Sequence, residues 1–159
     1  EVLRRMLIFQ EDQAFYDHRG YSLREIYMSL RDYLFRNRRL RGASTITQQL
    51  ARTLFLSRDR TLRRKFIELR LARMLEERLS KDRILRLYLN QVYWGAAEPG
   101  LAAAARAYYG VPSSALDLEQ SARLVARLPQ PGACPPGEIC RSASLKRRAA
   151  RLERVFTPE

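Results

Sequence analysis

Apolar side chains recur at steps of three and four residues along most of this chain, and this spacing constrains the fold more than any other feature. One such stripe follows Ser22, which forms a capping-box pattern with Glu25. Its members are Leu23, Ile26, Tyr27, Leu30, Tyr33 and Leu34. A period near 3.6 residues is that of an α-helix with one apolar face, and no alternating run bounded by turns predicts a hairpin. We therefore expect a mostly α-helical fold.

The same reasoning predicts further helices toward the C-terminus. They are expected at about 61–79, 81–89, 101–108, from 117 to the prolines at 129 and 131, and 146–154. Apolar positions of the first are Leu62, Phe66, Leu69, Ala72 and Leu75. Ser80 is a candidate N-cap, and Asp117 with Gln120 has the spacing of a capping box. Gly95, Pro99 and Gly100 predict a loop between two of these helices.

The charge of the chain limits the partners it can have. Its 159 residues fit one domain, and its formal net charge of +13 implies a polyanionic partner, namely nucleic acid, a phosphorylated substrate or an anionic membrane. All but three of the 30 basic residues are Arg, which favours planar contacts to phosphate or carboxylate. No apolar run is long enough for a transmembrane helix.

The chain has two cysteines and a single histidine. Cys134 and Cys140 lie six residues apart in a Pro- and Gly-rich stretch, where they form either a short disulfide loop or two free thiols. One histidine and two cysteines do not match the usual spacing of a zinc site. The sequence thus gives no reason to expect a metal held by nitrogen and sulfur ligands.

Three polar segments carry the candidate chemistry. Residues 11–20 place acids beside aromatic residues before a glycine, a pattern that also fits an ordinary solvated turn. Residues 42–52 set hydroxyls and amides around a helix start, where backbone N–H groups favour an anion. Arg64 and Glu68 stand one helical turn apart, as in a surface salt bridge or in a site. Two carboxylates near a phosphate-binding surface would suit glycosyl transfer from a sugar pyrophosphate.

These three segments also resemble the motifs of a known family, the peptidoglycan glycosyltransferases of glycosyltransferase family 51. Residues 11–20 resemble its EDxxFxxHxG motif, residues 42–52 its GxSTITQQLxK motif, and residues 64–68 its RKxxE motif. Residues 81–110 and 116–131 resemble the fourth and fifth motifs, in the family's order. The resemblance covers most of the chain. It implies a mostly α fold with a lysozyme-like large lobe and a smaller membrane-associated lobe.

The resemblance also implies roles for particular residues. Glu11 would be the general base that takes a proton from the 4-hydroxyl of the acceptor sugar, and Glu68 would be the second catalytic carboxylate, assisting the departing pyrophosphate directly or through a divalent ion. The substrate-binding residues implied by the motifs are Asp12, Ser44, Thr45, Gln48, Gln49, Arg52, Arg64, Lys65 and Asn90. The first five of these would also hold Glu11 in place. Arg52, Arg64 and Lys65 would neutralise phosphate charge in the transition state.

Substrate, cofactor and location follow from the same resemblance. The implied partners are lipid II, the nascent glycan strand, the bacterial cytoplasmic membrane and other cell-wall synthesis proteins, and no nucleic acid. A divalent cation, Mg²⁺ or Mn²⁺, is the only implied cofactor, with no organic one. We expect residues 1–159 to form a single glycosyltransferase domain, with about 21–41 as the membrane-associated lobe. The protein would work on the outer face of the membrane, anchored by a segment missing from this chain.

The chain departs from the family pattern at several positions. Arg52 stands where Lys is usual and keeps the charge, while Pro99, Val111 and Gln120 replace a usual aromatic residue, Lys and Glu. The ending at Pro129 and Pro131 and the basic last helix are more similar to the monofunctional branch. No SxxK motif of a transpeptidase occurs. The chain itself is therefore expected to polymerise glycan strands without cross-linking peptides.

Three alternatives remain open at this point. A basic helical nucleic-acid-binding module would explain the charge but not the segment 42–52 or the two glutamates. A lytic glycan-cleaving enzyme could also use a glutamate on a helical fold, but it has no need of a cationic cluster for phosphate. A non-catalytic scaffold would have no need of Glu11 or Glu68.

Overall fold

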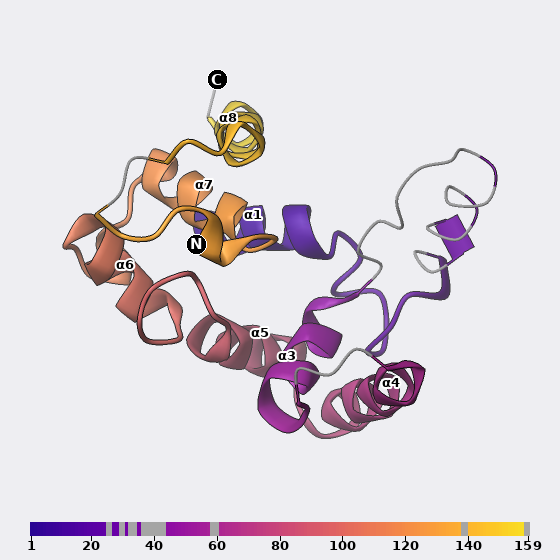
Figure 1. Cartoon of the computed structure of the whole chain (residues 1–159). Helices are drawn as coiled ribbons and strands as arrows, with labels where there is room; N and C mark the ends of the chain where they lie inside the picture. Colours follow the sequence, from indigo (N-terminus) through magenta and orange to yellow (C-terminus); the bar gives the residue numbers. More distant parts are fainter. Residues whose placement is uncertain are drawn as a thin grey trace. The chain divides into compact units, whose positions relative to one another are not determined.

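The computed structural model describes residues 1–24, 27, 28, 31, 35, 44–57, 61–137 and 140–157. Over these ranges the regular structure is helical and contains no β-strand, which confirms the mostly α-helical prediction (Figure 1). The α-helices are α1 (Val2–Glu11), α3 (Ile46–Phe55), α4 (Leu62–Arg78), α5 (Lys81–Gln91), α6 (Leu101–Tyr109), α7 (Leu118–Arg127) and α8 (Ala143–Phe156). Short 3₁₀ turns occupy Ser113–Ala115 and Pro131–Ala133.

The helices predicted after residue 60 are all present, and the predicted capping contacts of Ser80 and of Asp117 with Gln120 are formed. Thr61 and Ser142 cap α4 and α8, and the expected box of Asp117 and Gln120 opens α7. Because the amide oxygen of Gln120 accepts from Asp117 N at 3.2 Å, glutamine performs the capping role at this position where glutamate is usual. The backbone N–H of Arg83 donates to Ser80 Oγ at 3.3 Å.

One helix was missed from the sequence, whereas the described residues of the helix expected after Ser22, among them Leu23, Tyr27 and Phe35, are helical. Helix α1 was not expected, although Leu3, Met6 and Leu7 have helical spacing and are all buried. The helix expected after Ser22 falls mostly outside the described residues, including Glu25, Ile26, Leu30, Tyr33 and Leu34. Within the described helices, none has both the length and the apolar character needed to cross a membrane.

The chain packs as two units. One, here called the terminal unit, comprises Glu1–Gln10 and Leu89–Glu159, and the other, the central unit, comprises Glu11–Tyr88. In the terminal unit α7 packs against α8. Its core is apolar, with Leu124, Val125, Leu145 and Leu152 all at least 97% buried. The burial of such side chains supplies most of the favourable free energy of folding.

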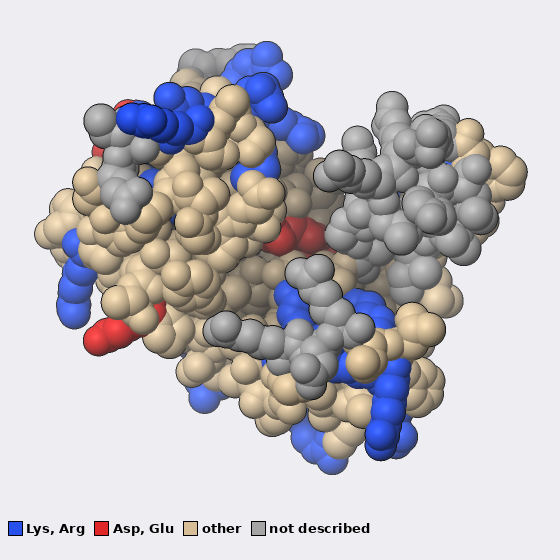
Figure 2. Space-filling model, viewed as in Figure 1, with Lys and Arg blue, Asp and Glu red and all other residues tan. Residues whose placement is uncertain are grey.

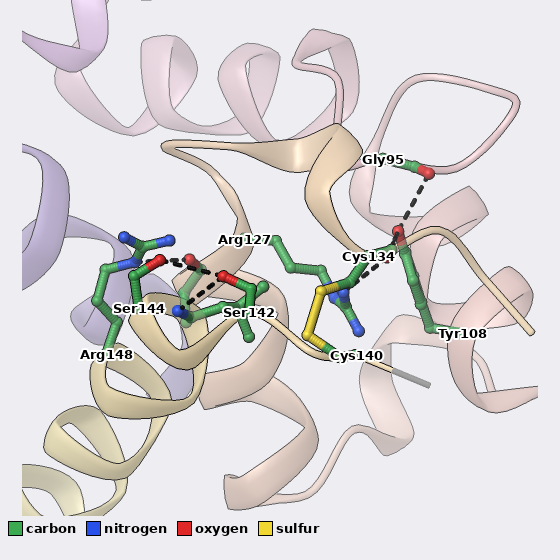
Figure 3. Close-up of a disulfide and its surroundings, with 10 residues drawn as sticks. Gly95, Tyr108, Arg127, Cys134, Cys140, Ser142, Ser144 and Arg148 are labelled. Atoms are coloured by element: carbon green, nitrogen blue, oxygen red, sulfur yellow. Dashed lines mark hydrogen bonds between the residues drawn. A yellow bond between two sulfur atoms is a disulfide. The ribbon is translucent and has the colours of Figure 1, made fainter. Parts of the chain in front are cut away.

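A disulfide closes the loop between α7 and α8 in the terminal unit (Figure 3). Cys134 and Cys140 are bonded, so the first of the two predicted alternatives is the correct one. The carbonyl oxygen of Cys134 accepts from Arg127 Nη1 at 2.8 Å and lies 3.0 Å from the Tyr108 hydroxyl. The disulfide therefore belongs to a network that ties the loop to α6 and α7.

The last helix presents a strongly basic outer face. Helix α8 begins three residues before the predicted start, and Leu145, Ala149 and Leu152 form its buried side. Its exposed basic residues are Lys146, Arg147, Arg151 and Arg154. Lys and Arg side chains gather over this helix on the face shown in Figure 2.

In the central unit α3 packs against α4, and of the five apolar positions predicted along α4 only Ala72 is buried. The buried residues of α4 are Glu68 and Ala72, whereas Leu62 and Phe66 are 91% and 63% exposed. The helix itself was predicted correctly. Its two buried residues are a carboxylate and a small residue, and the carboxylate, Glu68, belongs to the candidate site.

Candidate active site

Glu11 is the last residue of α1, and it is followed by a turn that is more than a solvated loop. Phe15 is fully buried in this turn, and Asp12 is 7% exposed. The backbone N–H of Phe15 donates to the carbonyl of Asp12 at 3.0 Å. The buried ring of Phe15 thus anchors the segment, so that Glu11 and Asp12 are set by packing.

Asp12 connects this turn to the start of α3. Its Oδ2 accepts from the backbone N–H of Ile46 at 3.0 Å, while Gln48 N donates to the hydroxyl of the N-cap, Thr45. From the sequence, the N–H groups at this helix start were expected to bind a substrate anion. That interpretation needs correction, because the carboxylate of Asp12 and the Thr45 hydroxyl already satisfy two of these donors.

His18 holds Asp12 from the other side. Its Nε2 lies 2.9 Å from Asp12 Oδ2, and its Nδ1 accepts from the backbone N–H of Gly20 at 3.2 Å. Since Nδ1 is an acceptor, the ring proton resides on Nε2 and is donated to the carboxylate. The side chains of both residues are at least 93% buried.

Gly20 allows this turn to approach α4 closely. Its φ is +94°, and a Cβ atom there would lie 3.0 Å from the backbone carbon and oxygen of Ala72. Its carbonyl accepts from Thr45 Oγ1 at 2.7 Å and lies 3.4 Å from Gln48 Nε2. Two substrate-binding residues implied by the sequence, Thr45 and Gln48, are therefore buried residues that hold the turn carrying Glu11 and Asp12.

Glu68 forms a buried charge cluster with two cations of its own helix. Its side chain is fully buried, Oε1 accepts from Lys65 Nζ at 2.6 Å, and Oε2 accepts from Arg64 Nη1 at 3.0 Å. This confirms that Arg64 and Glu68 share one face. It also shows that their pairing is not the ordinary surface salt bridge.

Lys65 extends this cluster to α3. Besides Glu68, its ammonium group donates to Ser44 Oγ and to Gln48 Oε1, each at 2.9 Å. Three acceptors match the three hydrogens of an ammonium group. An incoming phosphate oxygen would therefore replace one of these acceptors, and Ser44, which is only half-buried, is the one nearest to solvent.

The contacts of Glu68 bear on the divalent cation that the family resemblance implied. Both of its oxygens already accept from a cation, and two positive groups beside it oppose a further one. The described residues contain no group of three or more His, Cys, Asp or Glu side chains placed to hold a metal. The surroundings of Glu68 therefore do not fit a directly bound divalent ion.

Gln49 lies between Glu11 and a buried tyrosine. Its Nε2 donates to Glu11 Oε2 at 3.1 Å, and its Oε1 accepts from the hydroxyl of Tyr88 at 3.0 Å. Tyr88 is fully buried. Burial, followed by the charge of Glu11, raises the pKa of Tyr88 well above its usual value, with Asp12 acting in the same direction and Arg52 against it.

Two predicted site residues are placed differently from the rest. Arg52 is exposed near the end of α3, and Asn90 is exposed near the end of α5, within the terminal unit. All the predicted site residues except Asn90, Arg52 included, belong to the central unit. Three residues of the site, His18, Gly20 and Tyr88, were not predicted from the sequence. The first two lie inside the first motif and Tyr88 lies within the fourth, so the motifs contained the signal.

The central unit also contains a polar cavity of about 550 Å³ that lies outside the two candidate carboxylates. The turn after Phe15 lines one part of it, with Tyr16, His18 and Arg19, while Glu76 near the end of α4 and Lys81 at the start of α5 line another. Neither Glu11 nor Glu68 contributes to its wall.

Comparison with known proteins places this geometry in a family. The family model described as Transglycosylase matches residues 1–156. The chain is 48% identical over 129 residues to a biosynthetic peptidoglycan transglycosylase of Burkholderia cenocepacia (strain HI2424), a match that covers 81% of the chain and 53% of the relative. A protein of the same name from Nitrosospira multiformis is 45% identical over 129 residues, covering 81% of the chain and 56% of the relative. The chain thus spans about half the length of these curated relatives, and it belongs to the Transglycosylase family.

Proposed function

We propose that this chain polymerises the glycan strands of peptidoglycan, transferring the growing chain from undecaprenyl pyrophosphate to the 4-hydroxyl of lipid II. The observation that carries the proposal is that two carboxylates, Glu11 and Glu68, occur in one unit with sharply different surroundings. Glu11 is only partly buried and one of its contacts is the amide of Gln49, whereas Glu68 is fully buried between two cations. Carboxylates in contrasting environments suit two different tasks in one reaction.

In the proposed reaction Glu11 is the general base. It takes the proton of the acceptor 4-hydroxyl while that oxygen forms a bond to C1 of the donor sugar, and the bond from C1 to the pyrophosphate oxygen breaks with inversion. A positioned carboxylate base contributes about 10²- to 10⁴-fold to such a rate. The electron pair of the broken bond leaves with undecaprenyl pyrophosphate.

Glu68 would act through its neighbours. It fixes Arg64 and Lys65 on one face of α4, and these cations would stabilise the negative charge that grows on the leaving pyrophosphate. The Nε of Arg64 is buried and has no acceptor among the described residues, so it retains a donor for a ligand. No step of this reaction depends on a divalent ion, in keeping with the contacts of Glu68.

The proposed location is the outer face of the cytoplasmic membrane, where a lipid-linked donor is used. The described residues of the segment 21–41 support contact with a membrane, because Leu23, Tyr27 and Phe35 are 72%, 64% and 81% exposed. Large exposed apolar side chains in one segment are typical of a surface that another phase covers. The basic residues of the chain would bind anionic head groups, and each Lys or Arg near the surface would contribute about 1 kcal/mol to the binding free energy.

The test is polymerisation of labelled lipid II by wild type and by Glu11→Gln in detergent. Glutamine keeps the size of the side chain and removes its basicity, so we expect at least a hundredfold loss of polymerisation, within the range of about 10²- to 10⁴-fold for a lost base. Glu77→Gln, a change at an exposed position of α4, is the matched control and should keep full activity.

Other outcomes would favour the alternatives. Cleavage of finished glycan strands without use of lipid II would identify a lytic enzyme, and salt-sensitive binding of DNA without binding of lipid II would identify a nucleic-acid-binding module. Polymerisation that survives Glu11→Gln at matched circular dichroism would remove the assigned base.

A further inference from the structure

Tyr88 does not touch the reacting groups of the proposed site, yet two hydrogen bonds through Gln49 connect it to the base. It lies on α5 and is fully buried, and its hydroxyl donates to Gln49 Oε1 at 3.0 Å. The amide of Gln49 in turn donates from Nε2 to Glu11 Oε2 at 3.1 Å. These three side chains, from three different helices, form a relay that ends at Glu11.

The chemistry of the tyrosine hydroxyl determines the direction of this relay. Because burial keeps the Tyr88 hydroxyl protonated, its hydrogen requires an acceptor, and Gln49 Oε1 is the acceptor it has. Once the amide oxygen faces Tyr88, the amide nitrogen faces Glu11. The carbonyl of Ser44, 3.5 Å from Gln49 Nε2, favours the same orientation.

The opposite orientation of the Gln49 amide would place two hydrogen-bond acceptors against each other. A flipped Gln49 would point its Oε1 at the carboxylate of Glu11, so that two acceptors would face each other without a hydrogen between them. An amide alone chooses between two such orientations by its hydrogen bonds. Tyr88 therefore supplies the constraint that sets which end of the amide meets the carboxylate.

We propose that Tyr88 is a positioning residue for the reaction: through Gln49 it fixes the orientation of the Glu11 carboxylate. This inference rests on the proposed function, in which Glu11 is the base. A base must be held in its reactive geometry, and small displacements of reacting groups cost large factors in rate. The effect therefore falls on kcat rather than on the binding of lipid II.

The direct test is Tyr88→Phe, which removes one hydroxyl and keeps the ring. We expect kcat for lipid II polymerisation to fall by about tenfold while KM stays within about twofold, as for an interaction that acts on the transition state alone. An unchanged kcat in a folded Tyr88→Phe protein overturns the proposal.

Tyr108→Phe is the matched control for the loss of a tyrosine hydroxyl. Tyr108 lies on α6 in the terminal unit and contacts the carbonyls of Gly95 and Cys134, with no link to Glu11. The Tyr108→Phe variant also loses a hydrogen bond that stabilises the fold. It therefore shows how much kcat changes when a tyrosine hydroxyl with only a structural role is removed. We expect it to lower the melting temperature and leave kcat at the wild-type value. Equal losses of kcat in the two variants would contradict a positioning role.

A double-mutant cycle isolates the relay. In a Gln49→Leu background the link from Tyr88 to Glu11 is already cut, so adding Tyr88→Phe should change kcat by less than about twofold. Fully multiplicative losses would show that Tyr88 acts by another route. If Tyr88→Phe does not fold, Gln49→Leu alone, which keeps the Tyr88 ring, takes its place, and a wild-type kcat there overturns the relay.

Running Glu11→Gln in the same assay separates this inference from the proposed function. Activity that survives Glu11→Gln removes the base, and with it the function of the relay. Loss of activity in Glu11→Gln together with a wild-type kcat in Tyr88→Phe leaves the proposed function standing and overturns the positioning role alone.

Discussion

The two ends of α4 contain the same pair of residues at the same spacing, in opposite surroundings. Near its start, Arg64 and Glu68 are 3.0 Å apart, with side chains 17% and 0% exposed. Near its end, Arg73 and Glu77 are 2.9 Å apart, with side chains 43% and 55% exposed. Distance and spacing do not distinguish the two pairs, and burial does.

Burial changes what each pair contributes. A carboxylate taken out of water needs compensating charge, and Glu68 receives it from Lys65 as well as from Arg64. Glu77 stays in water, where the attraction is weak and screened by salt. The stability of the fold is therefore expected to depend on the ion pair of Glu68 and not on the ion pair of Glu77.

The largest effect is expected for Glu68→Gln. Removal of the charge leaves Arg64 and Lys65 without their counter-ion and should lower the free energy of unfolding by about 3 kcal/mol. Polymerisation should fall as well, because the two cations lose the group that orients them. Urea denaturation followed by far-UV circular dichroism measures the first effect, and lipid II polymerisation the second.

The probe matters in this measurement. The single tryptophan, Trp94, is buried in the terminal unit, so its fluorescence reports on a different unit from the one that holds Glu68. A shift of the circular-dichroism midpoint by no more than that of Glu77→Gln would contradict the view that the buried pair stabilises the fold.

This contrast also shows what the sequence could predict. The period of the apolar residues predicted the helices after residue 60, and i,i+4 spacing predicted that Arg64 and Glu68 share a face. Spacing within one helix carries no information on which face meets another helix. For that reason the apolar spacing of Leu62 and Phe66 did not reveal that both are exposed, nor did the spacing of Glu68 reveal that it is buried.

The candidate site was predictable to a similar degree. The motifs brought the predicted residues of the central unit to attention, but they did not show that Asp12 satisfies an N–H group at the start of α3. That contact joins residues 34 positions apart, and such contacts arise only from packing. The link from Tyr88 to Glu11 through Gln49 has the same origin.

Glu76 provides an intermediate case on the same helix. Its side chain is 6% exposed, and its Oε1 accepts from Thr47 Oγ1 at 2.6 Å and from Lys81 Nζ at 2.7 Å. Glu76→Gln keeps an acceptor for the hydroxyl and removes the charge that pairs with Lys81. We expect a loss of about 1–2 kcal/mol in the free energy of unfolding, typical of a hydrogen bond to a charged group.

The expected order along α4 is therefore Glu68, then Glu76, then Glu77. Urea midpoints of the three Glu→Gln variants, measured together in one buffer, test this order. If Glu76→Gln lowers the free energy of unfolding by no more than Glu77→Gln does, then the exposure of the glutamate side chain does not determine how much each ion pair stabilises the fold.

The smallest effect is expected for Glu77→Gln, and salt makes it a sharp test. The pair with Arg73 is exposed, so its loss should change the free energy of unfolding by no more than about 0.5 kcal/mol. Raising the ionic strength from about 0.15 M to 1 M shortens the screening length from about 8 Å to 3 Å and should abolish even this difference. The loss caused by Glu68→Gln should persist in the same high-salt buffer, because water and ions do not reach the buried carboxylate. Equal salt sensitivity of the two variants would mean that the pair at the start of α4 is as open to solvent as the pair at its end.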